Sequence, residues 1–397
     1  MTKARPLLLL WGTILTSPVE AQLQLGGQVI PIVTTTTAVP GGTALAEGRL
    51  VQPLLRLQAA ALGGRLRLDA LGDFEGWMMP HGQLTTGAYG EGFVDRRHPH
   101  TFVHEFVVSA PDLLGSLDGP VAITLAAGKG FVPYGTDDPM TRPPLLYPVN
   151  HHIAQVLERA VAVAAVRAGP VTVEGAVFNG DEPERPAQWP NWRRFGDSWA
   201  TRVTFTPLAG LEWQVSRGHV HSPEHRAGAG LDAEQWSTSL RWERGFRYAF
   251  IDWARRADGG AFLFHTLLAE GAWQMGRHRP YARLERTERP EEQRIDDGFR
   301  SLRPHLDNNI LGITRWSIGT LGYALKAGTT ARGRVTLQPT VEGSVARVVR
   351  VTGVFDPAIF YKRSTLYTMS IGVRIDWAGD MAGHRMGRYA SPAPHHH

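Results

Sequence analysis

The stretch Tyr367-Thr-Met-Ser-Ile-Gly-Val-Arg-Ile-Asp-Trp377 alternates apolar and polar side chains without interruption. Successive side chains of a β-strand point to opposite faces, so one face of this strand is apolar and the other carries Arg374 and Asp376. The apolar face begins and ends on an aromatic residue. A transmembrane β-strand has this form, with lipid on one side, water on the other and aromatic residues at both interfaces. A half-buried strand of a soluble β-sandwich alternates in the same way, so the rest of the chain must decide.

The N-terminus of the 397-residue chain has the features of a secretory signal peptide. Lys3 and Arg5 are positively charged, the segment from Leu7 to Leu15 is apolar, and residues 19–21 form a small-residue cleavage motif. The apolar segment is shorter than the roughly 20 residues that a membrane-spanning helix needs. We therefore predict a signal peptide over residues 1–21 and an exported chain from residue 22.

Composition excludes several classes of protein. The chain has no cysteine, so no disulfide framework holds it together. No later apolar run approaches the length of a spanning helix, and only helices and closed barrels satisfy their backbone groups in lipid. The formal net charge is +5, and the basic residues form no cluster along the sequence, which argues against nucleic-acid binding. The mature chain is therefore either soluble or crosses a membrane as strands.

Strand-like alternation continues along the chain, and no helical periodicity stands out. We predict an all-β fold, a transmembrane antiparallel β-barrel of about 16 strands over residues 22–377. The predicted strands are residues 28–37, 50–62, 65–73, 101–110, 121–129, 155–168, 171–179, 198–206, 211–219, 235–244, 247–256, 261–275, 280–287, 310–325, 334–347 and 365–377. Residues 378–397 are expected to form a disordered C-terminal tail.

The connections between these segments alternate in length down most of the chain. Short ones such as Gly63-Gly64 and Gly169-Pro170 alternate with long ones such as residues 74–100 and 130–154. Outer-membrane barrels have tight turns at the periplasmic end and long loops at the external end. A sandwich has no reason to sort its loops in this way. The pattern therefore favours a barrel with short periplasmic turns and long external loops.

The polar faces of several predicted strands carry charges of both signs, which a sandwich core does not tolerate and a water-filled lumen does. We expect a barrel of this size to enclose an aqueous pore. The predicted pore-lining residues are Arg202, Glu212, Arg241, Glu243, Glu342, Arg374 and Asp376. Because both signs are present, we predict weak ion selectivity.

Histidines gather in predicted loops, where imidazole is the commonest protein ligand for zinc, copper and nickel. The candidate metal ligands are His98, His100, His104, His151 and His152. With a third cluster at residues 219–225, we expect them at one rim of the barrel. The alternative is that these are polar loop side chains that only bond the backbone, with no metal or other cofactor.

No motif predicts catalysis. The sequence lacks an HExxH helix, a nucleophile elbow and a glycine-rich phosphate loop. An outer-membrane lipase would need a Ser/His/acid arrangement, for which His104 and Glu105 are the only hint. Adjacent strand residues face opposite ways, so we expect no enzymatic activity.

Three motifs carry a resemblance to a known group of proteins. They are Asp95-Arg-Arg-His-Pro-His100 with Glu105, Val149-Asn-His-His152, and Val173-Glu-Gly-Ala-Val-Phe-Asn-Gly-Asp-Glu-Pro183. The chain resembles porin-like bacterial outer-membrane barrels that share His-Pro-His, His-His and Phe-Asn-Gly-x-Glu-Pro motifs in this order. The resemblance spans roughly residues 50–245. It implies an outer-membrane location and a barrel fold, and it implies no particular activity.

These observations lead to one favoured function and one alternative. We expect an outer-membrane channel for passive diffusion of small polar solutes or ions. The alternative is a copper- or zinc-binding or uptake protein that uses the histidines. The expected partners are the lipid bilayer, lipopolysaccharide, the barrel-assembly machinery and a possible second copy of the chain.

Overall fold

The computed structural model describes residues 22–77, 100–115, 119–136, 138–149, 151–183, 185–245, 247–292, 310–329, 335–354, 356–378 and 385–390. The predicted signal peptide, residues 1–21, lies outside the described residues. His98 does so too.

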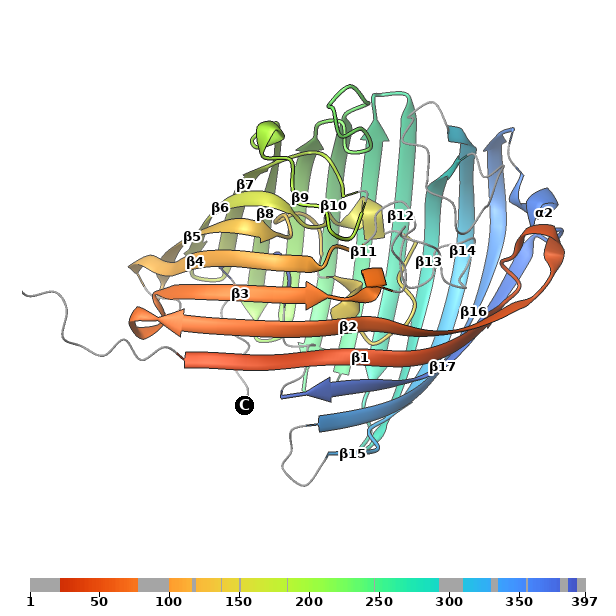
Figure 1. The fold of residues 1–397 in the computed structure, drawn as a ribbon, viewed down its shortest axis with the longest axis horizontal. Coiled ribbons are helices and arrows are strands. Elements are labelled where there is room, and N and C mark those ends of the chain that lie inside the picture. The colour runs from red at the N-terminus through yellow and green to blue at the C-terminus, as the bar shows by residue number, and fades with distance from the viewer. Residues whose placement is uncertain are drawn as a thin grey trace, which may run out of the picture.

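Sixteen long antiparallel strands form one closed β-barrel (Figure 1). They are β1 (Gln22–Thr36), β2 (Leu45–Ala61), β3 (Leu66–Asp73), β4 (Val103–Gly115), β5 (Val121–Gly130), β6 (Arg159–Ala168), β7 (Val171–Phe178), β8 (Ser198–Leu208), β9 (Leu211–Val220), β10 (Ala233–Arg244), β11 (Arg247–Asp258), β12 (Phe262–Trp273), β13 (His278–Glu292), β14 (Ile310–Leu325), β16 (Val335–Gly353) and β17 (Thr365–Trp377). The two-residue strand β15 (Gly328–Thr329) pairs with β16. Each predicted segment overlaps one strand, although several strands extend beyond the predicted ends, and the predicted fold is confirmed.

The strand that alternates most regularly, β17, closes the barrel by pairing with both β16 and β1. Trp377 lies opposite Val335 of β16 and Gly27 of β1. A Cβ atom on Gly27 would lie only 2.1 Å from Cζ2 of the Trp377 ring, so glycine is required at this closing position. Because Gly27 has no side chain, the ring of Trp377 packs directly against β1.

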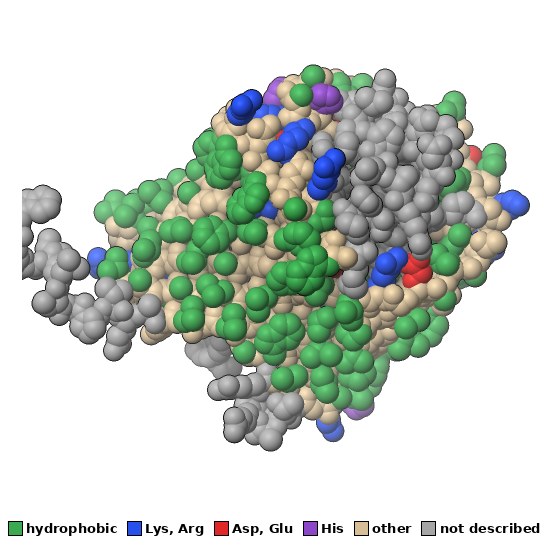
Figure 2. All heavy atoms as spheres, in the orientation of Figure 1, with side chains coloured by type: hydrophobic (Ala, Val, Ile, Leu, Met, Phe, Trp, Pro, Cys, Tyr) green, Lys and Arg blue, Asp and Glu red, His purple; other side chains and the backbone are tan. Residues whose placement is uncertain are grey.

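The barrel wall is apolar outside and polar inside. In β17, Tyr367, Met369 and Ile371 are exposed, whereas Ser370 and Arg374 are buried. Figure 2 shows hydrophobic side chains spread over the outer wall formed by β1 to β5, with few charged ones among them. Lipid on the outside accounts for this inverted distribution, as in transmembrane barrels.

Tryptophan and arginine form a belt on the outer wall at one end of β8 to β11. The Arg217 guanidinium lies 5.7 Å from the ring centre of Trp199 and 5.7 Å from that of Trp236. Arg255 lies 5.1 Å from the Trp236 ring on its other side. Side chains that combine an apolar body with a polar tip collect at membrane–water interfaces. We infer that this belt marks the level of the lipid headgroups.

A charge in the middle of the lipid-facing wall is expected to destabilise the barrel. Leu267, midway along β12, faces outward, so Leu267→Arg is expected to cost about 2–4 kcal/mol. Leu208, beside the turn after β8, provides the control, and Leu208→Arg is expected to cost about 0–1 kcal/mol. Reversible denaturant unfolding in lipid vesicles measures both values. Equal costs would contradict the assigned membrane depth.

Short helical elements occupy the connections. They are η1 (Pro40–Gly42), η2 (Leu62–Gly64), η3 (Glu75–Trp77), η4 (Pro139–Thr141), α1 (His151–Ala154), η5 (Trp192–Arg194) and α2 (Pro357–Phe360). Across the described ranges, no helix has the length and apolar character needed to cross a membrane.

The connection from β5 to β6, residues 131–158, folds into the barrel; we call it the inner loop. The sequence predicted a long loop at the external end of the barrel over residues 130–154, and the described residues of this loop fold inward instead of extending from the rim. Nearly all described residues of the inner loop are buried, and α1 contacts β10, β11 and β12. Leu145 and Leu146 pack with Ile30 and Ile32 of β1, which explains why this apolar segment avoids water.

Part of the C-terminal tail also lies inside the barrel. We call residues 385–390 the inner tail. Met386 packs in one buried cluster with Leu54, Leu71 and Phe131, and Ala390 is fully buried. The expectation of a disordered tail is therefore corrected for these six residues. The physical reason is that the inner wall and the inner loop supply polar and apolar partners for them.

Candidate functional site

The barrel interior contains most of the predicted pore-lining residues. Five are buried on the inner face: Arg202, Glu212, Glu342, Arg374 and Asp376. Arg241 and Glu243 share the inner face of β10, but the Glu243 side chain is 51% exposed beside a turn. Glu243 therefore lies at the end of the wall and not in its interior. The five buried residues differ from the expected water-filled lining because the inner loop and inner tail cover parts of the wall.

The inner tail is held by charge on the wall of β9. The two terminal nitrogens of Arg385 lie 2.6 and 2.9 Å from the carboxylate oxygens of Glu212. Arg388 Nη2 approaches the same carboxylate at 2.8 Å. A two-pronged arginine–carboxylate pair is among the stronger polar contacts in proteins and fixes orientation as well as position. Glu212 is thus a docking point for the tail.

A buried ion pair joins the wall, the inner loop and the inner tail. Arg202 Nε donates to Glu174 Oε2 at 2.7 Å, and both residues are fully buried. The remaining nitrogens of Arg202 donate to the carbonyls of Gly135 in the inner loop and Gly387 in the inner tail. Tyr389 adds to this junction, because its backbone N–H donates to Glu174 at 3.0 Å and its hydroxyl donates to the inner loop.

The far side of the inner loop is held by acidic residues of the wall. Glu342 accepts hydrogen bonds from the backbone N–H groups of Leu145 and Leu146, at 2.7 and 3.0 Å. The Tyr281 hydroxyl donates to the same carboxylate at 2.9 Å. Arg283 donates to the Leu146 carbonyl at 2.7 Å. Charged wall residues therefore bind the peptide backbone of the inner loop.

The Phe-Asn-Gly-x-Glu-Pro motif has a structural role at the end of β7. Asn179 accepts a hydrogen bond from the Ala160 N–H at 2.7 Å and donates to Asp181 at 2.9 Å. A Cβ on Gly180 would lie 2.0 Å from the His221 carbonyl oxygen, so only glycine fits. The motif thus fixes the start of β6 and allows the β9–β10 connection, which contains His221, to approach closely.

The four candidate metal ligands that the structure describes, His100, His104, His151 and His152, lie buried within the barrel, so the predicted position at the rim was wrong for these four. Their rings form a continuous chain through Tyr147. His104 lies 5.3 Å from His100, and His100 lies 5.7 Å from Tyr147. Tyr147 lies 5.6 Å from His151, whose ring centre is 4.0 Å from that of His152. All four histidines are buried, His151 and His152 on the inner loop and His100 and His104 at the start of β4 beside it.

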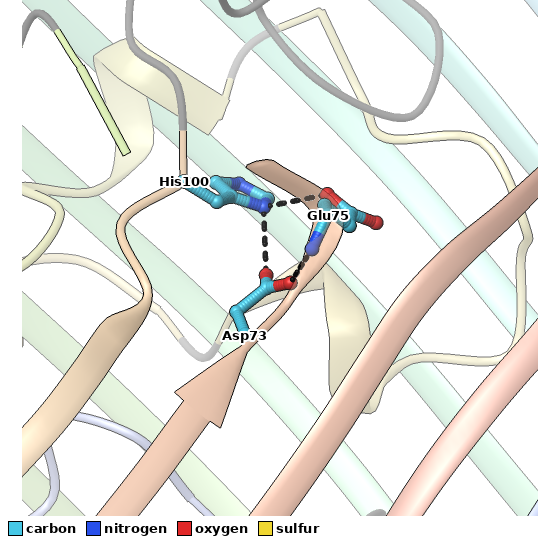
Figure 3. Close-up of side chains that lie close together, drawn as sticks. All are labelled: Asp73, Glu75 and His100. Carbon is cyan, nitrogen blue, oxygen red and sulfur yellow. Dashed lines mark hydrogen bonds and ion pairs between the residues drawn. The ribbon is translucent and has the colours of Figure 1, made fainter. Parts of the chain in front are cut away.

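Two carboxylates that were not predicted from the sequence, Asp73 and Glu75, face His100 (Figure 3). Its Nδ1 lies 3.1 Å from Asp73 Oδ2 and 3.0 Å from Glu75 Oε2. Burial lowers the pKa of His100, but the two carboxylates outweigh it and raise this pKa well above its usual value. Burial and the neighbouring Asp73 raise the pKa of Glu75. The three side chains form a compact acid–imidazole cluster, which we call the His100 triad.

Backbone geometry builds the His100 triad. Asp73 is the last residue of β3, and its Oδ1 accepts the Glu75 N–H at 2.9 Å. Glu75 Oε1 accepts the N–H of Gln52, a residue of β2 with a positive φ of 49°. The register of β1 against β2 shifts between Gln28 and Ile30, opposite this residue. Such a bulge re-aims a backbone group, here toward Glu75. Each carboxylate therefore uses one oxygen for structure and turns the other toward His100.

A second buried cluster lies beside the triad. His104 Nδ1 lies 3.5 Å from Glu158 Oε1, and Lys129 donates to Thr101, which donates to the same oxygen at 2.8 Å. Burial raises the pKa of Glu158, but His104 and Lys129 outweigh it and lower this pKa. The histidines stood out in the sequence as candidate ligands, but Asp73, Glu75 and Glu158 did not, because Asp73 and Glu75 at the end of β3 and Glu158 before β6 meet the histidines only in the fold.

Solved structures with the same architecture identify the fold. An anion-selective porin from Comamonas acidovorans matches with a TM-score of 0.53 and 12% sequence identity, covering 90% of this chain and 100% of that one. The fold is that of the porins. OmpF of Salmonella typhi, solved in complex with daunomycin, matches with a TM-score of 0.50 and 9% sequence identity, covering 89% of this chain and 97% of that one.

The porin fold places the chain in the bacterial outer membrane, as predicted, because its outer wall is apolar and its strands close on themselves. No protein-family model and no curated protein matches the sequence. At these identities the likeness concerns the porin fold alone.

Proposed function

We propose that the chain is an outer-membrane channel for passive diffusion of small polar solutes or ions, narrowed by the inner loop and occluded by the inner tail. The charged inner wall carries this proposal. Glu212, Arg202 and Glu342 bind segments that are not strands of the barrel. A sixteen-stranded barrel encloses an aqueous channel unless something fills it.

The chemistry of these contacts favours detachable segments over a permanent core. A buried ion pair is often replaced by apolar residues at no cost to stability, so charges are a poor way to build a fixed interior. The same charges are well solvated once a segment leaves and water enters. The wall therefore suits two states, one with the inner tail bound and one with water in its place.

The channel is expected to show weak ion selectivity. The buried charges of the inner wall include the positive side chains of Arg202, Arg283 and Arg374 and the negative side chains of Glu174 and Glu342. Mixed signs leave no ring of one charge to exclude ions of the same sign. The reversal potential in a planar bilayer under a potassium chloride gradient is expected near zero. A reversal potential close to the Nernst potential of either ion would contradict the lumen assignment.

A second candidate function is transition-metal binding or uptake. The observation that favours it is the gathering of His100, His104, His151 and His152 beside buried carboxylates. Titration of the purified barrel with copper or zinc tests this function. Binding weaker than millimolar would remove it.

The remaining proposals concern partners and relatives. We infer that the barrel contacts lipopolysaccharide at the Trp–Arg belt, where Arg217 and Arg255 reach headgroup level. The regular strand β17 suits recognition by the barrel-assembly machinery. We further propose that the chain forms a homo-oligomer. We also propose that it belongs to the group of porin-like barrels with His-Pro-His and Phe-Asn-Gly-x-Glu-Pro motifs. Chemical cross-linking in native membranes tests the oligomer.

A further inference from the structure

We propose that Asp73, Glu75 and His100 form a binding site for one divalent first-row transition-metal ion inside the barrel. The site does not depend on whether the barrel conducts. It also differs from the histidine set that the sequence suggested, because two of its three ligands are carboxylates.

The donor atoms already converge. Asp73 Oδ2, Glu75 Oε2 and His100 Nδ1 belong to a group whose ligand atoms all lie within 4.8 Å of one another. The two distances from Nδ1, 3.0 and 3.1 Å, lie close to the roughly 3.0–3.4 Å that separates neighbouring donors of an octahedral or tetrahedral ion with bonds of about 2.1 Å. An ion therefore fits between these atoms after small side-chain rotations.

The carboxylates are oriented before any ion arrives. Oδ1 of Asp73 and Oε1 of Glu75 are held by backbone N–H groups, which leaves Oδ2 and Oε2 directed at one point. Hydrogen bonds of this kind to the non-ligating oxygen position ligands in metal sites and raise affinity. Asp73 Oδ2 is fully buried and, among the described residues, has no hydrogen-bond partner, with His100 Nδ1 as its ion-pair contact.

Charge and neighbouring groups point to the class of ion. A divalent cation balances two carboxylates, and an N,O donor set suits Zn²⁺, Fe²⁺ or Mn²⁺ better than Cu⁺, which prefers sulfur. His104 stands next to the site, its ring centre 5.3 Å from that of His100. In the described part of the chain neither ring nitrogen of His104 has a hydrogen-bond partner, and its Nδ1 has Glu158 Oε1 as an ion-pair contact at 3.5 Å. His104 is positioned to become a fourth ligand after a side-chain rotation.

The test is a competition titration with Zn²⁺ against a chromogenic chelator, on full-length barrel in detergent. Every sample carries H395A, H396A and H397A, because terminal histidines bind zinc by themselves. One equivalent of Zn²⁺ is expected to bind at micromolar concentration or tighter. His100→Gln and, separately, Asp73→Asn are each expected to weaken binding at least 100-fold.

A surface variant controls for adventitious binding. His221 pairs with Asp232 at 2.6 Å in the connection between β9 and β10, so His221→Gln removes a comparable imidazole–carboxylate pair. This variant is expected to bind zinc as the unsubstituted barrel does. Loss of binding in His221→Gln together with retention in His100→Gln would overturn the proposal.

Anomalous diffraction gives a readout that needs no substitution in the triad. A zinc-soaked crystal is expected to show an anomalous peak between Asp73, Glu75 and His100. A crystal with zinc only elsewhere, or no binding tighter than millimolar, would overturn the site. Neither result bears on conductance, so failure here leaves the channel proposal standing.

Discussion

Deletion of residues 378–397 is expected to raise the single-channel conductance of the barrel several-fold. The deletion removes the inner tail, which binds Glu212 through two arginines and packs Met386 against Phe131 of the inner loop. Water then replaces buried peptide along β7 to β9, and the ion path widens. Planar-bilayer recording of the full-length and truncated chains measures the change.

Two variants separate occlusion by the inner tail from other effects of truncation. Removal of residues 391–397 alone keeps the inner tail and is expected to leave the conductance unchanged. Glu212→Gln weakens both arginine contacts and is expected to cause frequent transitions to the larger conductance. If the truncated chain conducts no better than the full-length chain, the tail does not occlude the channel.

Glu342→Ala is expected to release the inner loop from the wall. The substitution removes the acceptor of two backbone N–H groups and of the Tyr281 hydroxyl. A hydrogen bond to a charged group contributes about 1.5–3 kcal/mol, so amide protection at Leu145 and Leu146 is expected to fall by roughly 10- to 150-fold for each bond lost. Hydrogen–deuterium exchange with mass spectrometry measures the protection of this segment.

The control for this prediction is Glu243→Ala. Glu243 shares the inner-facing side of its strand, but its half-exposed side chain pairs with Arg241 at the end of the wall. Its loss is expected to leave exchange in the inner loop unchanged. Equal effects of the two substitutions would show that Glu342 does not hold the loop.

The sequence predicted the barrel well because alternation acts within single strands. The face of each residue in β17 follows from its neighbours alone, and glycine or proline between strands marks each turn. The inner positions of Arg202, Glu212 and Glu342 follow from the same rule. No information about distant segments is needed for these predictions.

The contents of the barrel were not predictable in this way. The inner loop is a long connection whose length suggests an external loop, and only its burial against β1 reveals its place. The inner tail lies inside because Arg385 and Arg388 meet Glu212, 173 positions away for Arg385. The His100 triad depends on the bulge at Gln52; Pro53 beside it is a local sign of an irregular strand, but nothing local shows that Glu75 accepts the Gln52 N–H. These are long-range contacts, and a single sequence does not show them.

The most direct test of an occluded channel uses a single cysteine in this cysteine-free chain. Thr204 of β8 is buried on the inner face and touches Arg388 of the inner tail at 3.1 Å, whereas its neighbour Val203 faces lipid. A charged, membrane-impermeant thiol reagent is applied during bilayer recording to Thr204→Cys and Val203→Cys. We predict rapid stepwise loss of current for Thr204→Cys in the chain lacking residues 378–397, slow modification with the tail present, and no effect for Val203→Cys. Equal rates at Thr204→Cys with and without the tail would contradict the account.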